Sequence, residues 1–309
     1  MAVNSVEPVV SETLFRDRLD SLRASYANHD DLVRELQGFV RTVPDDQIVR
    51  INPIHYAADR GRDEAEIIDL FLHARKAGLL TMEWDYVCRG CGQIIASFDT
   101  LNAANEHSFC KTCLKNRDAD LSDFVEIGFT VSKAVRKSRF HDPETLSPKE
   151  FYIDYNISAN ALARDGTKAR DFYWRHKVFC TYVEPNETRT FEINLEPGFL
   201  VFQYGPELII DASSDNSVKR IDITHRDGRP AEPVQIVAPG SLRYTLTNAS
   251  PVRIIAFALS ITEPERTAFK ETPPGFTLGG FLSGPPSRRA NEQKLRGGQK
   301  WLDKGRFTR

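Results

Sequence analysis

The sequence contains no hydrophobic run long enough to cross a membrane. Its most apolar stretch, VRIIAFALSI at 252–261, falls well short of the roughly 20 residues that a membrane helix needs, and Arg253 interrupts it. The first residues, MAVNSVEPVVSE, show no basic segment followed by an apolar one, so they do not predict a signal peptide. We therefore expect a soluble protein that resides in the cytoplasm.

An excess of charge of either sign is also absent. The chain carries 41 Lys and Arg against 43 Asp and Glu, a formal net charge of −2, which predicts no general attraction to nucleic acid or to anionic membranes. Apolar residues make up 40% and charged residues 27%, as in ordinary globular proteins. A length of 309 residues favours about two domains.

The sequence lacks several signatures of catalysis. It has neither the G-x4-G-K-[ST] loop that holds nucleotide phosphates nor the G-x-G-x-x-G fingerprint of dinucleotide binding. Between residues 181 and 262, His225 is the only histidine, so this region does not offer the clustered imidazoles of a β-barrel metalloenzyme. These absences argue against an enzyme.

Cysteine is the most informative residue type that the sequence does contain. Four of the five cysteines form two close pairs, Cys88 with Cys91 and Cys110 with Cys113, and residues 92–109 separate the pairs. This is the spacing of C-x2-C-x15–20-C-x2-C zinc sites. Two such turns aim four thiolates at one Zn²⁺, each about 2.3 Å from the metal, and leave no position open for water. The sequence therefore predicts a structural zinc centre with four cysteine ligands.

Other interpretations of the cysteines stay open. A disulfide framework is typical of small secreted chains, and a C-x-x-C pair is also used in redox catalysis. His107 lies close to the second pair and is an alternative ligand, although four cysteines already suffice. Gly92 follows the first pair and suits the unusual backbone of a metal-binding turn. Cys180 stands alone and is expected to be a small buried side chain.

Hydrophobic periodicity predicts a helical module over residues 1–83. Two helices are expected within 11–41, with a break near 28–30. Pro53 opens a short helix, and Asp63 and Gly78 are the expected N-cap and C-cap of a longer one. A strand over 81–87 then leads to Cys88. Two short helices followed by a strand are typical of a winged helix, and residues 84–117 are expected to form a zinc ribbon.

From residue 118 to residue 262 the pattern changes to short strands rich in β-branched and aromatic residues. This pattern predicts an antiparallel β-sandwich or barrel, and the whole chain is assigned to the α+β class. Residues 263–309 are rich in proline and glycine and then basic, and we expect them to be disordered. The expected strands are FVEIGFTV, EFYIDYNI, WRHKVFCTYV, TRTFEINL, FLVFQYG, SVKRIDIT, PVQIVAP, SLRYTLTN and RIIAFALSI.

A nucleic-acid-binding function is the alternative that the sequence leaves open. The winged-helix-like module, the predicted ribbon and the basic tail would supply the contacts, with the tail making salt-dependent bonds to phosphates. Against this, the helix expected after Asp63 carries Glu64, Glu66 and Asp69 beside Arg75 and Lys76. A DNA-reading helix needs cations directed at phosphates and bases, so a helical packing module is favoured.

Three stretches carry a resemblance to a known family. They are INPIHYAADRGRDEAEIIDLFLHARKAGLLTMEWDYVCRGCG, DLSDFVEIGFTVSKAVRKSRFHDPETL and PGSLRYTLTNAS…RIIAFAL. Together they resemble the N-terminal regulatory domain of unassigned function that precedes many bacterial class III adenylate and guanylate cyclase domains. The resemblance covers residues 48–262, and its most specific parts are GLL-x-x-x-W-x-x-x-C-x-x-C and DFVEIGFTVSKAVR. It implies metal ligation by Cys88, Cys91, Cys110 and Cys113, although Arg89 stands where the family usually has proline.

The resemblance implies a regulatory function. It predicts a non-catalytic module that senses a protein partner or a small ligand and acts on a signalling enzyme, normally a nucleotide cyclase. The sequence contains no Phe-Thr-Asp-like strand to present the Mg²⁺-binding aspartate of a class III cyclase, nor a segment to hold one. We therefore expect that any cyclase activity would come from an associated catalytic domain.

Overall fold

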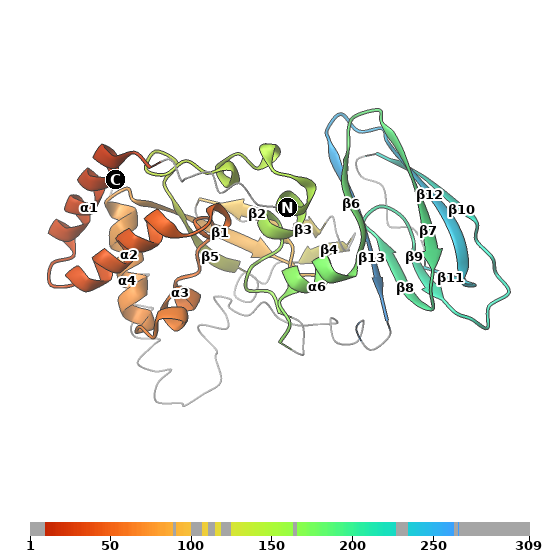
Figure 1. Ribbon diagram of the computed structural model, residues 1–309, viewed down its shortest axis with the longest axis horizontal. Coiled ribbons are helices and arrows are strands. Elements are labelled where there is room, and N and C mark those ends of the chain that lie inside the picture. Colours follow the sequence, from red (N-terminus) through yellow and green to blue (C-terminus); the bar gives the residue numbers. More distant parts are fainter. Residues whose placement is uncertain are drawn as a thin grey trace.

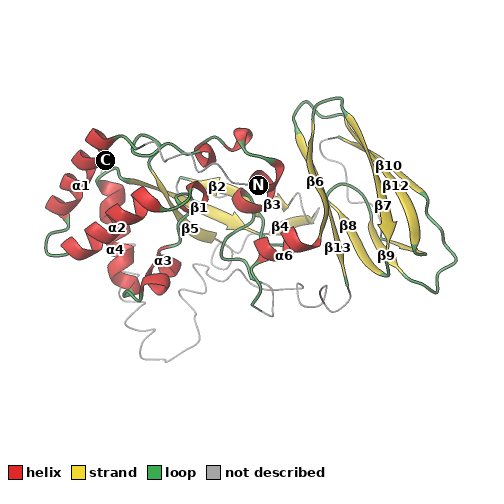
Figure 2. Ribbon diagram, in the orientation of Figure 1, coloured by secondary structure: helices red, strands yellow, loops and turns green. Residues whose placement is uncertain are grey.

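The computed structural model describes residues 10–88, 91–99, 107–110, 115–118, 125–162, 166–226, 234–262 and 265. Figure 1 shows an elongated α+β molecule with a helical end, a small central sheet and a β-sandwich at the opposite end. Figure 2 shows the longer helices at the first end and short helical segments in the middle of the molecule, while the sandwich consists of strands alone. Within the described part of the chain, no helix is long and apolar enough to cross a membrane.

The helical end confirms the predicted helices. It contains α1 (Glu12–Ser25), α2 (Asp30–Thr42), a 3-10 turn η1 (Asp45–Gln47), α3 (Pro53–Arg60) and α4 (Glu64–Lys76). Asp63 caps α4 as expected, because its side chain accepts hydrogen bonds from the first backbone N–H groups of that helix. Gly78 follows α4 with a φ of 76°, the left-handed conformation that ends a helix.

The central sheet has the strand order β2-β1-β5 and is antiparallel. It consists of β1 (Leu80–Val87), β2 (Ile94–Phe98) and β5 (Val125–Val131). We expected β5 among the strands of the later β domain, but it pairs along its whole length with β1. Its apolar face explains this placement, since Phe129 and Val131 are buried in the core of the helical end, where Phe71 meets Phe129 edge to face at 5.2 Å.

Arg136 ties the chain after β5 to the C-terminal end of α2. The residue is 1% exposed, and its guanidinium donates hydrogen bonds to the carbonyl oxygens of Val40 and Val43 at 2.8 and 2.7 Å. It also forms an ion pair with Asp45 at 2.9 Å. The carbonyls at the end of α2 have no partners within the helix, so a buried cation suits this position.

Replacing Arg136 with methionine is expected to destabilise the protein by about 3 kcal/mol. The substitution keeps the buried volume but leaves buried carbonyl oxygens without their charged donor. Urea denaturation of the two proteins measures the difference. The matched control is Arg139→Met, because the Arg139–Glu150 pair is largely exposed on the arginine side and should contribute less than about 1 kcal/mol. Equal effects of the two substitutions would contradict this role of Arg136.

Short helical segments connect the central sheet to the sandwich. They are η3 (Arg139–His141), η4 (Pro143–Thr145), the π-helical turn η5 (Glu150–Tyr155) and α6 (Ala169–His176). The predicted strand EFYIDYNI is therefore wrong. A strand would direct the neighbours Tyr152 and Ile153 to opposite faces, whereas the helical turn buries both in one cluster. The predicted strand WRHKVFCTYV begins only at Lys177, because its first residues complete α6.

The sandwich consists of two sheets that bury one core between them. One sheet has the order β11-β9-β8-β13-β6 and the other has the order β10-β12-β7. The strands are β6 (Lys177–Val183), β7 (Thr188–Leu195), β8 (Gly198–Phe202), β9 (Glu207–Ile210), β10 (Arg220–His225), β11 (Gln235–Val237), β12 (Gly240–Asn248) and β13 (Ile254–Ile261). Strand β9 was not predicted, since ELII is too short to show a pattern.

Two strand pairs of the sandwich are parallel, which corrects the expectation of a purely antiparallel domain. They are β9 with β11 and β10 with β12. From β9 to β12 the chain alternates between the two sheets, so consecutive strands do not pair. Because consecutive strands reverse direction, strands two apart in the sequence run the same way and pair in parallel.

Strand β13 explains the most apolar stretch of the sequence. Ala256 and Ala258 point into the core between the two sheets, while Ile255, Phe257 and Leu259 belong to a second cluster outside the sandwich. A strand that is buried on both faces needs a continuous apolar sequence. The second cluster contains three buried cysteines and lies at the junction between the central sheet and the sandwich.

Candidate metal centre

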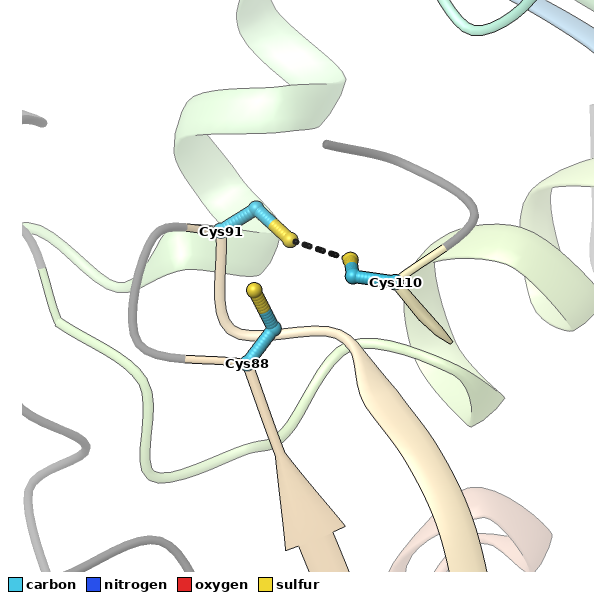
Figure 3. A group of neighbouring side chains, drawn as sticks. All are labelled: Cys88, Cys91 and Cys110. Carbon is cyan, nitrogen blue, oxygen red and sulfur yellow. Dashed lines mark hydrogen bonds between the residues drawn. The ribbon is translucent and has the colours of Figure 1, made fainter. Parts of the chain in front are cut away.

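The turn between β1 and β2 positions Cys88 and Cys91. Cys88 directly follows β1, and its N–H donates to the carbonyl oxygen of Gln93 at 2.7 Å. Its own carbonyl oxygen accepts hydrogen bonds from the N–H groups of Cys91 and Gly92 at 3.4 and 2.8 Å. These bonds close a tight turn that directs both thiol groups to the same side (Figure 3).

The third cysteine comes from the second predicted pair. Cys110 is the last residue of β3 (His107–Cys110), which pairs antiparallel with β4 (Lys115–Asp118). The Sγ atoms of Cys88, Cys91 and Cys110 all lie within 4.8 Å of one another. We call these three residues the thiol cluster. The structure thus brings together cysteines from both predicted pairs, as the spacing indicated.

The distances within the thiol cluster favour a metal over a disulfide. The Sγ atoms of Cys91 and Cys110 are 3.5 Å apart, whereas a disulfide requires about 2.05 Å. Four sulfurs placed tetrahedrally at about 2.3 Å from a zinc ion are about 3.8 Å from one another. The donor chemistry and the spacing of the described thiols therefore fit Zn²⁺.

The thiol cluster is closed to solvent. Cys88, Cys91 and Cys110 are 1%, 5% and 0% exposed. They are part of a larger apolar cluster, the junction core, whose other buried members come from η5, α6, β13 and the residues between η5 and α6. These members are Tyr152, Ile153, Ile157, Ala161, Ala169, Tyr173, Ile255, Phe257 and Leu259. The cluster thus lies where the central sheet meets the sandwich.

The model of the family described as "Family of unknown function (DUF5939)" matches residues 15–268. The chain belongs to this family. No curated protein and no solved structure matches the chain. The DUF5939 match begins in α1, ends beyond β13, and includes the thiol cluster and the position of Cys113.

A short segment, residues 156–161, covers the turn that holds Cys88 and Cys91, and the sequence did not reveal it. Ile94 N–H donates to the carbonyl oxygen of Asn156 at 2.7 Å, and Ser158 N–H donates to that of Gly92 at 2.8 Å. From α6, the Tyr173 hydroxyl donates to the carbonyl oxygen of Cys91 at 3.0 Å. We refer to residues 156–161 as the covering segment. The one hint of the covering segment in the sequence was Gly92. A Cβ atom at this position would lie 2.5 Å from the Cβ atom of Ala161, so only glycine lets the covering segment pack this closely.

The remaining cysteines and the candidate histidine are placed as follows. Cys113 lies outside the described residues, so its role as the fourth ligand stays a prediction. The backbone of His107 lies in β3, but its side chain is not described. Cys180 lies on β6 at the border of the junction core and outside the thiol cluster. Burial raises the pKa of its thiol to about 12, which suits the packing role predicted for it.

Proposed function

We propose that the thiol cluster binds one Zn²⁺ ion, with Cys113 as the fourth ligand, and that the metal is structural. The support is the spacing of the cysteines in the sequence together with the burial and the Sγ–Sγ distances of three of them. Zinc supplies the bonds that hold the turn after β1 and the end of β3 together. Since Cys88 directly follows a strand with an antiparallel partner and Cys110 is the last residue of another, we infer a zinc ribbon.

We propose further that the protein is a non-catalytic regulatory module that acts on a signalling enzyme, and that this enzyme is a class III nucleotide cyclase. The observation that carries the regulatory part is the location of the closed thiol cluster in the junction core, between the central sheet and the sandwich. A rigid junction of this kind transmits a change in one half to the other. The cyclase is proposed on the resemblance of residues 48–262.

The helical end is the part that we propose to contact the partner enzyme. Helices α3 and α4 lead directly into β1, whose antiparallel partners complete a small sheet, so we infer a winged-helix-like module. The outer surface of α4 combines Glu64, Glu66 and Asp69 with Arg75 and Lys76. Such a mixed surface suits a protein partner better than the uniform negative charge of nucleic acid.

The test combines the purified, zinc-loaded protein with the catalytic domain of a class III adenylate cyclase. We expect no cyclic nucleotide from ATP or GTP with this chain alone, and a changed rate when it is added to the catalytic domain. The effect should disappear with Cys110→Ser and persist with Cys180→Ser. Cyclic nucleotide production by the chain alone would refute the non-catalytic assignment, and an unchanged rate without complex formation would refute the cyclase as partner.

A further inference from the structure

The second face of the central sheet carries an unusual set of buried charges. In β1, Glu83 and Asp85 point to the face opposite the helical core, and Glu126 of β5 lies on the same face, directly across from Asp85 in the strand register. Asp85 and Glu126 are 2% and 5% exposed. Two carboxylates opposite each other on one face of a strand pair repel when both are ionised.

The nearest cation pairs with Asp85 and not with Glu126, although burial still raises the pKa of Asp85 against the lowering effect of Arg50. Arg50 Nε lies 3.2 Å from Asp85 Oδ2 and 3.8 Å from Glu83 Oε2. The Ser97 hydroxyl also donates to Asp85. Arg170 of α6 acts on Glu126 only at longer range, where Asp46 and Asp154 offset its charge. Among the described residues, Glu126 forms no ion pair.

Glu126 instead holds the covering segment through neutral donors. Its Oε2 accepts hydrogen bonds from the Ser158 hydroxyl and from Asn160 Nδ2, both at 2.7 Å. The backbone N–H of Ser158 donates to Gly92 at the metal-binding turn. Ser158 therefore connects Glu126 to the thiol cluster's turn, and this contact joins the central sheet to the covering segment.

The other oxygen of Glu126 indicates where a proton resides. Glu126 Oε1 is buried, and the described residues offer it no hydrogen-bond partner; the same holds for Asn160 Oδ1. A buried carboxylate oxygen without a donor strongly favours protonation. Burial raises the pKa of Glu126 to about 7, against the lowering effect of the hydrogen bonds from Ser158 and Asn160.

We propose that Glu126 is a proton-operated latch between the central sheet and the covering segment. With the carboxyl protonated, the face that it shares with Asp85 carries one negative charge fewer, and the covering segment is held against the sheet. When the carboxyl ionises, the repulsion from Asp85 and the buried unpartnered oxygen loosen this contact. The latch does not depend on the identity of the metal or of a partner enzyme.

The direction of the pH effect follows from linkage. A carboxyl with a pKa of about 7 in the closed contact and the usual 4.5 in the open one binds protons more tightly when the contact is closed. Its contribution to the closed state is complete below pH 4.5 and is lost as the pH rises to about 7. Mild acidification therefore strengthens the contact, opposite to the weakening that acid causes at thiolate metal sites.

The test is hydrogen exchange of the Ser158 amide in the metal-loaded protein, measured between about pH 5 and pH 8 and corrected for the intrinsic exchange rate. The protection factor is expected to fall on the order of 50-fold over this range and then level off. Amides of β12, far from the latch, should keep a constant protection factor. A Ser158 protection factor that stays constant or rises with pH in the wild-type protein overturns the proposal without any variant.

Substitution of Glu126 tests whether this carboxyl causes the pH dependence of the Ser158 protection factor. Glu126→Gln keeps an oxygen acceptor for Ser158 and Asn160 but does not titrate, so most of the pH dependence of its Ser158 protection factor should be lost, and only the contribution of Asp85 and Glu83 should remain. Glu150→Gln is the matched control: burial raises the pKa of Glu150, but hydrogen bonds from Ser147 and Arg139 outweigh this and keep it below the usual value. This control should retain the wild-type pH dependence. The same pH dependence in Glu126→Gln as in the wild type refutes the latch.

Discussion

Replacing Cys110 with serine is expected to release the metal and to unfold the junction between the central sheet and the sandwich. Metal binding to a structural thiolate site contributes about 10–16 kcal/mol that is coupled to folding. This is comparable to the whole free energy of unfolding of a typical domain, about 5–15 kcal/mol. Cys110 is fully buried in the junction core, so a water molecule from solvent cannot replace the lost thiolate ligand. Thermal unfolding together with metal analysis measures both effects.

The control for this prediction is Cys180→Ser. Cys180 borders the same apolar cluster but lies outside the thiol cluster, so its substitution removes a sulfur atom without removing a ligand. We expect this variant to retain its metal and to lose at most about 1–2 kcal/mol of stability. If Cys110→Ser and Cys180→Ser behave alike, the thiol cluster is not a metal centre.

Substitution of Gly92 by alanine is expected to lower the free energy of unfolding strongly. Gly92 has a φ of 71°, and a Cβ atom built on it would lie 2.5 Å from the Cβ atom of Ala161 in the covering segment. The strained backbone and the forced displacement of the covering segment together cost about 3–5 kcal/mol. The displaced segment would also distort the metal-binding turn, so a chelator should remove the metal more readily from the variant.

Gly61→Ala separates the effect of backbone strain from the effect of displacing the covering segment. Gly61 ends α3 with a φ of 60°, but a Cβ atom there would meet nothing within 4 Å. It therefore tests backbone strain alone, with an expected cost of about 1 kcal/mol and no change in metal retention. Denaturation curves and chelator competition on both variants distinguish the effects. Equal losses of stability in the two variants would show that Gly92 is not in contact with the covering segment.

The parts of the fold that local sequence determines were predicted well. The N-cap at Asp63, the glycine at Gly78 and the strand that leads to Cys88 depend on residues that are close in the sequence. The proximity of Cys91 and Cys110 was also predictable, because the two cysteine pairs have the spacing that is typical of metal sites. In each case the physical constraint acts over a few residues or through one recognisable residue type.

The parts that depend on tertiary packing were not predicted. The segment EFYIDYNI has the composition of a strand, but the burial of Tyr152 and Ile153 against the junction core imposes a helical turn. Strand β5 was separated from its partner β1 because pairing across a distance leaves no local signal. The strand TMEWDYV was predicted, but only the structure reveals that its Asp85 lies buried directly across from Glu126.

X-ray absorption at the zinc edge, on protein purified without added metal, identifies the metal and its ligands in one measurement. We expect about one zinc ion per chain, surrounded by sulfur alone at about 2.3 Å. We expect this sulfur shell to be lost in Cys110→Ser and retained in Cys180→Ser. A wild-type protein that contains no metal, or whose metal is bound by oxygen and nitrogen, would contradict a structural zinc centre with four cysteine ligands.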